Sequence, residues 1–120
     1  MSERIYLAGP MNRYADNNVP GFLYAARMLR AEGHEVFNPG EHGEERLLKK
    51  RPEYKHSEKF RRAVYYKDCK FITKRATMIC FLPGWEKGRG AQMEHALATA
   101  LLPFIKIRYL DMKYVKGWIP

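Results

Sequence analysis

Two carboxylates and a tyrosine, Glu94, Asp68 and Tyr6, are the side chains of this sequence best suited to chemistry. Glu94 lies in the first turns of a predicted helix, just after a buried apolar run and a glycine-rich loop. The partial positive charge of a helix start favours an ionised carboxylate, and a rigidly held carboxylate can act as a nucleophile. Met93 and Leu97 are expected to define the core face of this helix, which places Glu94 at the edge of that face. The alternative is a first-turn glutamate that only complements the helix dipole.

Asp68 falls on the apolar face of a predicted basic helix, four residues after Val64 and four before Ile72. Buried acids are rare without a partner, and a pKa raised by burial would suit a proton donor. The alternatives are a buried salt bridge or a different helix phase. Tyr6 lies in the middle of a predicted strand, where its hydroxyl either positions a carboxylate or is satisfied locally.

The loop before Glu94 could hold an anion. Gly84, Gly88 and Gly90 allow a backbone to approach a ligand closely, and free N–H groups at a helix start can bind a phosphate. Arg89 and Arg13 flank the expected pocket and are either phosphate contacts or simply exposed. His95 is expected to face solvent or a subunit contact. The other histidines and the two cysteines show no metal-binding spacing, so no metal site is predicted.

The elements that position these residues alternate between strand and helix. Strands are predicted at 4–8, 35–38, 76–82 and 103–109, and helices at 19–32, 41–51, 57–74 and 89–101. The tail, 110–120, is expected to add a short edge strand or to stay loose. Such alternation predicts an α/β fold, a mainly parallel sheet of four or five strands with helices on both faces. The carboxyl ends of the strands then share one edge, where ligands bind.

The residues expected at this ligand edge follow the first, second and third strands. They are Gly9, Pro10, Met11, Asn12, Arg13, Asn38, Gly84, Trp85, Gly88, Arg89 and Gly90.

The length of 120 residues indicates one domain over residues 1–120, and its net charge is +9. Residues 49–75 hold eleven Lys or Arg against three acids. This concentration of positive charge attracts nucleic acid, nucleotides or phosphate esters. The alternative is that the charged residues only form a solvated helix face. No apolar run is long enough to span a membrane, and the start does not read as a secretory signal. With no cysteine framework, a cytoplasmic location is expected.

Four stretches together resemble a known superfamily. They are "IYLAGPM" at 5–11, "AARMLRAEGHEVFNPGE" at 25–41, "YYKD" at 65–68 and "FLPGWEKGRGAQMEHALA" at 81–98. They are similar to the nucleoside 2-deoxyribosyltransferase-like superfamily, and more closely to a small branch of it common in phages and bacteria. The resemblance covers roughly residues 4–107. It implies a flavodoxin-like (Rossmann-like) three-layer sandwich and assembly as a dimer or larger homo-oligomer.

The resemblance also implies an activity, because characterised relatives cleave the N-glycosidic bond of nucleosides or nucleoside monophosphates. They are hydrolases or transferases that pass the sugar to water or to another base. Carried over by motif, Glu94 would be the nucleophile, Tyr6 would orient it, and Asp68 would be the acid that assists base departure. No metal or redox cofactor is needed. The pKa of Asp68 should then be raised, whereas that of Glu94 should not be.

This sequence departs from the monophosphate-cleaving relatives at two phosphate-contacting serines, whose positions are Pro10 and Gly88 here. Either Arg13 or Arg89 replaces those contacts, or the substrate carries no phosphate there. Two other functions stay open. One is a non-catalytic protein that binds nucleotides or signalling molecules in the same pocket. The other is a basic nucleic-acid-binding protein that uses residues 49–75, although no known binding motif supports it.

Overall fold

A computed structural model describes residues 2–11, 14–41 and 51–117. Asn12 and Arg13, which were expected to contact a ligand, lie outside the described residues. So does nearly all of the predicted helix at 41–51. Within the described part, no helix is long and apolar enough to cross a membrane.

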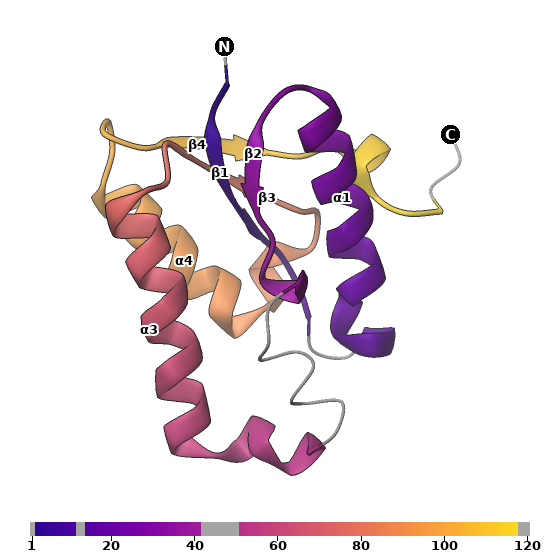
Figure 1. Ribbon diagram of the computed structural model, residues 1–120, viewed down its shortest axis with the longest axis vertical. Coiled ribbons are helices and arrows are strands. Elements are labelled where there is room, and N and C mark those ends of the chain that lie inside the picture. The colour runs from indigo at the N-terminus through magenta and orange to yellow at the C-terminus, as the bar shows by residue number, and fades with distance from the viewer. Residues whose placement is uncertain (1, 12–13, 42–50, 118–120) are drawn as a thin grey trace.

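The sheet has four parallel strands in the order β2-β1-β3-β4 (Figure 1). The strands are β1 (Arg4–Ala8), β2 (Glu35–Phe37), β3 (Met78–Phe81) and β4 (Lys106–Tyr109). All four predicted strands are confirmed, and β3 and β4 are shorter than expected. Tyr6 stands beside Phe37 of β2 and Ile79 of β3 in the register of the sheet. Because the order reverses direction around β1, a ligand crevice is expected between the loops that follow β1 and β3.

Helices cover both faces of the sheet, which gives the expected flavodoxin-like three-layer sandwich. Helix α1 (Val19–Ala31) lies on one side, and α3 (Glu58–Lys74) and α4 (Arg89–Ala100) lie on the other (Figure 1). The α1 face buries Phe22, Ala25, Ala26 and Leu29, as their helical spacing predicts. Ser57 caps the start of α3, because its side chain accepts a hydrogen bond from the Phe60 N–H.

Alternate residues of β1 serve two separate cores. Ile5 and Leu7 pack with the residues of α1, whereas Tyr6 and Ala8 pack with the residues under α3 and α4. This division follows from the period of two along a strand. It sends the Tyr6 side chain to the face that carries α3 and α4.

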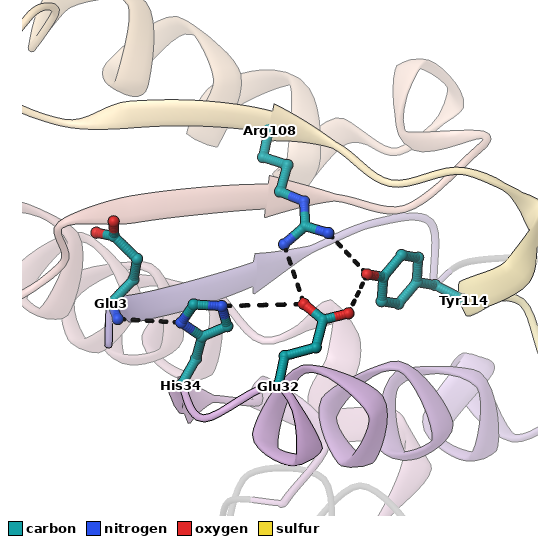
Figure 2. Close-up of polar contacts among 5 residues, drawn as sticks. All are labelled: Glu3, Glu32, His34, Arg108 and Tyr114. Carbon is teal, nitrogen blue, oxygen red and sulfur yellow. Dashed lines mark hydrogen bonds and ion pairs between the residues drawn. The ribbon is translucent and has the colours of Figure 1, made fainter. Parts of the chain in front are cut away.

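The tail was expected to add an edge strand or to stay loose, and over its described residues, 110–117, both expectations are wrong. It forms a 3-10 turn, η5 (Met112–Tyr114), and Tyr114 is buried in the α1-side core. The Tyr114 hydroxyl donates a hydrogen bond to Glu32, and Arg108 donates one to the same hydroxyl at 2.7 Å. Arg108 also pairs with Glu32 at 3.3 Å (Figure 2). These contacts hold the pKa of Glu32 below its usual value. The hydrogen bond from Tyr114 has the larger effect, and that from Arg108 the smaller.

The same network reaches the start of the chain. His34 lies 3.9 Å from the Glu32 carboxylate and accepts a hydrogen bond at 3.0 Å from the backbone N–H of Glu3 (Figure 2). The buried aromatic ring and these polar contacts explain why the tail is docked. Neither is visible in the local pattern of residues 110–120.

Candidate functional site

Tyr6 is at the centre of the candidate site and is 1% exposed. Its ring stacks on Phe37 of β2, with ring centroids 5.4 Å apart, and Phe37 in turn stacks on Phe71 of α3 at 4.5 Å. Both phenylalanines were missed as site residues in the sequence. The aromatic stack holds the Tyr6 ring in place. Its hydroxyl donates a hydrogen bond to Oε2 of Glu94.

Glu94 lies in the middle of the buried face of α4 and is 6% exposed. The buried residues of this helix are Ala91, Glu94 and Ala98, whereas Met93 and Leu97 are only partly buried. The expectation that Met93 and Leu97 define the core face is therefore wrong. Small alanines on either side of Glu94 form the inward face, and this phase directs the carboxylate at Tyr6.

Asp68 approaches the same hydroxyl from α3. It is 8% exposed and shares the inward face of α3 with Ile72, as predicted. Burial raises the pKa of Tyr6 well above its usual value, and the charges of Glu94 and Asp68 and hydrogen bonds to both raise it further. Both carboxylates thus meet on one face of the sheet, around the Tyr6 hydroxyl. The same arrangement keeps that hydroxyl protonated.

The ionisation of Glu94 differs from the expectation of an unshifted pKa. Burial raises the pKa of Glu94 from 4.5 to about 8, opposed by the hydrogen bond from Tyr6 and reinforced by the charge of Asp68. Removal from water therefore outweighs the helix dipole, which acts mainly on exposed groups in the first turn. In the ligand-free protein, Glu94 holds a proton at neutral pH.

The loops after β1 and β3 touch, as expected for the ligand edge. A side-chain carbon at Gly9 would lie 2.9 Å from Cβ of Leu82, and one at Gly88 would lie 3.4 Å from Cα of Pro10. The Asn18 side chain donates a hydrogen bond at 2.8 Å to the Pro10 carbonyl. Gly9, Pro10 and Gly88 therefore lie where the two loops touch.

The other predicted contacts are divided between the two sides of this loop contact. Met11 packs against the core under α1, and Gly84 (φ +88°) lies beside Tyr14 on that side, so neither faces the carboxylates. Gly90 lies near the Tyr65 ring at the start of α4, and Arg89 is exposed there.

Asn38 ends β2 with an unusual side chain, 1% exposed. Its Oδ1 accepts a hydrogen bond from the Gly40 N–H at 3.0 Å. Its Nδ2 has no partner among the described residues. An unsatisfied buried donor is costly, and this one stands at the carboxyl end of a strand beside β1. The role of Asn38 as a ligand contact stays a prediction.

His95 was expected to face solvent or a subunit contact, but it is half-buried in an aromatic cluster. Its ring stacks on Trp85 at 4.2 Å, and its Nε2 lies 2.7 Å from the hydroxyl of Tyr109. Phe81 completes the cluster at 5.1 Å from both rings. Trp85, predicted as a ligand contact, therefore packs on α4 through the His95 ring. Because these residues come from a loop, a helix and two strands, no spacing in the sequence indicates the cluster.

Within the described part of the chain, no group of three His, Cys, Asp or Glu side chains could hold a metal ion. A family model described as a domain of unknown function, DUF4406, matches residues 3–107. No curated protein and no solved structure matches the chain.

Proposed function

The chain belongs to the DUF4406 family, and we propose that it cleaves the N-glycosidic bond of a nucleoside or a nucleoside 5′-monophosphate. One observation carries the proposal: the Tyr6 hydroxyl joins two buried carboxylates, Glu94 and Asp68, on the face of the parallel sheet that carries α3 and α4. Paired carboxylates with different surroundings are the machinery of retaining glycoside cleavage.

In the proposed reaction, Glu94 attacks the anomeric carbon of the sugar. The bond between that carbon and the base nitrogen breaks, and a carboxylate–carbon bond forms. The departing base takes a proton from Asp68 and leaves as a neutral molecule. In the second step, water or an acceptor base attacks the anomeric carbon, Glu94 is released, and Asp68 regains the proton.

Tyr6 supplies the route by which the proton reaches Asp68. In the resting state the proton is on Glu94, whose pKa is about 8. In the structure the Tyr6 O–H points to Glu94. Once it turns to Asp68, the hydroxyl can accept the proton of Glu94 and donate its own to Asp68. Glu94 is then ionised for attack and Asp68 is protonated for donation, whereas Tyr6 is unchanged.

The rest of the site would bind and orient the substrate. The Nδ2 of Asn38, which has no partner among residues 2–11, 14–41 and 51–117, is a donor for a sugar hydroxyl or a base carbonyl. The glycine loops allow the backbone at Gly9 and Gly88 to approach the ligand. Burial of both carboxylates excludes water from the attacking oxygen, which strengthens electrostatic interactions in the transition state.

The test is base release from a panel of nucleosides and their 5′-monophosphates, measured by chromatography. The Glu94→Gln variant keeps the shape of the side chain but removes the nucleophile. Glu86→Gln makes the same change at an exposed position and is the matched control. We expect release by the wild type and by Glu86→Gln, and none by Glu94→Gln.

Equal release by all three proteins would contradict the proposed role of Glu94. No release from any substrate, also with acceptor bases added, would favour a non-catalytic nucleotide-binding protein. That second function predicts thermal stabilisation by a nucleotide that survives in Glu94→Gln.

A further inference from the structure

The outer surface of α3 carries a groove outside the buried carboxylate site. It has a volume of about 490 Å³, and Arg62, Tyr65, Tyr66, Lys70 and Lys74 are among the residues that line it. Arg62, Tyr66, Lys70 and Lys74 follow one another every four residues, and Tyr65 lies three residues after Arg62. All five therefore share one side of the helix. The nucleotide-cleavage proposal makes no use of this surface.

The groove is positively charged along its length. Lys70 and Lys74 are one helical turn apart, about 6 Å along the axis, and Arg62 lies two turns before Lys70. None of the described residues that line the groove is acidic. Of the two acids in α3, Asp68 is turned inward to Tyr6, and Glu58 forms an exposed pair with Arg62. A polyanion would therefore meet little opposing charge here.

Two tyrosine rings are exposed among these cations. Tyr66 is 70% exposed and Tyr65 is 37% exposed. Flat aromatic rings interleaved with cations are the features that bind single-stranded nucleic acid, because bases stack on the rings and the cations contact the phosphates. In a duplex the faces of the bases are covered, so the tyrosines would have nothing to stack on.

We propose that this groove of α3 binds single-stranded nucleic acid, with Tyr65 and Tyr66 as stacking platforms and Lys70 and Lys74 as phosphate contacts. The groove borders the candidate active site. A side-chain carbon at Gly90 of α4 would lie 3.8 Å from the Tyr65 ring, and Cys69 of the groove contacts Met93 at 3.7 Å. Binding here is a property separate from base release, and its readout does not depend on catalysis.

The experiment is fluorescence anisotropy with a short labelled oligodeoxythymidylate, titrated with the full chain at several salt concentrations. The first variant combines Lys70→Gln and Lys74→Gln. Its control combines Arg27→Gln and Lys116→Gln, which removes the same charge from exposed residues on the α1 side. We expect the first pair to weaken binding and to reduce the salt slope by about 1.4, at about 0.7 for each phosphate contact on a single strand. The control pair should leave the slope unchanged.

The stacking contribution is tested at Tyr66. Tyr66→Ser should weaken binding about tenfold, whereas Tyr66→Phe, which keeps the ring, should bind as the wild type does. Unlabelled duplex of the same length should compete poorly.

Three results would overturn the proposal. The first is an equal loss of binding in the two charge pairs, which would mark a diffuse charge effect. The second is equal competition by duplex or by polyglutamate, which would mark a surface for any polyanion. The third is the absence of oligonucleotide binding. If the protein also sediments as a dimer that Tyr66→Ser dissociates, the groove is a contact between two copies of the chain.

Discussion

The Tyr6 hydroxyl of β1 donates a hydrogen bond to Oε2 of Glu94 in α4, a residue 88 positions away in the chain. Asp68 of α3 is hydrogen-bonded to the same hydroxyl, so side chains from β1, α3 and α4 meet at one oxygen atom. The burial that brings the two carboxylates together also raises the pKa of Glu94. The first predictions depend on that link.

Glu94 should make the protein less stable as the pH rises. Its pKa is raised to about 8 in the folded state from 4.5, so the folded protein binds a proton that the unfolded chain has lost between these values. This stabilisation is complete below pH 4.5 and is lost as the pH rises through 8. The slope is at most about 1.4 kcal/mol per pH unit. Urea unfolding between these limits should show this slope in the difference between wild type and Glu94→Gln, because groups such as Glu32 titrate in both proteins.

Base release should decline above pH 8, because Glu94 there loses the proton that the proposed transfer supplies to Asp68 for the departing base. A profile of kcat/KM against pH reports this ionisation in the free enzyme. A profile that instead rises steadily through pH 9 would show that Glu94 must lose its proton to bulk solvent, and the proposed transfer through Tyr6 would be wrong.

Removal of the Tyr6 hydroxyl should reduce activity more than stability. Tyr6→Phe keeps the ring stacked on Phe37 but removes the hydrogen bond that lowers the pKa of Glu94, so this pKa should rise further. We expect a loss of about 10²-fold or more in kcat, in the range of lost acid–base catalysis. The change in unfolding free energy should be about 1 kcal/mol. An unchanged kcat would exclude a role for the hydroxyl in the reaction.

Tyr114→Phe is the matched change on the opposite face of the sheet. It removes the hydroxyl that Glu32 and Arg108 share, at an expected cost of about 1 kcal/mol in urea unfolding. The carboxylate site is on the other face, so kcat should not change. A loss of activity equal to that of Tyr6→Phe would indicate that either hydroxyl acts only through stability.

Two glycine substitutions test the contact between the loops. At Gly9 an added side-chain carbon would clash with Leu82 at 2.9 Å, so Gly9→Ala should displace the loop after β1, lower the melting temperature and raise KM. At Gly90 the nearest atom would be 3.8 Å away, in the Tyr65 ring. Gly90→Ala should therefore be tolerated and should stabilise α4 by up to about 1 kcal/mol. Equal melting temperatures would contradict the close approach at Gly9.

The sequence predicted most of the fold, because its elements depend on local periodicity. The spacing of Phe22, Ala25, Ala26 and Leu29 identified the buried side of α1. The apolar run at 76–82 identified a strand buried on both faces, observed as β3. The position of Asp68 among apolar residues was likewise enough to predict that it is buried.

Several features could not be predicted because they depend on contacts between distant segments. The inward face of α4 was placed on Met93 and Leu97, because apolar residues usually face a core, yet the structure turns Glu94 inward to meet Tyr6. The stacking of His95 on Trp85 needs a loop folded back over a helix.

By itself, the sequence determined the order of the four strands along the chain, the buried side of α1 and the burial of Asp68. These properties follow from the periods of strand and helix, which act over a few residues. Only the tertiary structure decided that Glu94 and Asp68 meet at the Tyr6 hydroxyl, that Glu94 holds its proton at neutral pH, and that the tail is docked through Tyr114. Desolvation and packing sum the contributions of all the surrounding segments, so they exist only once the chain is folded.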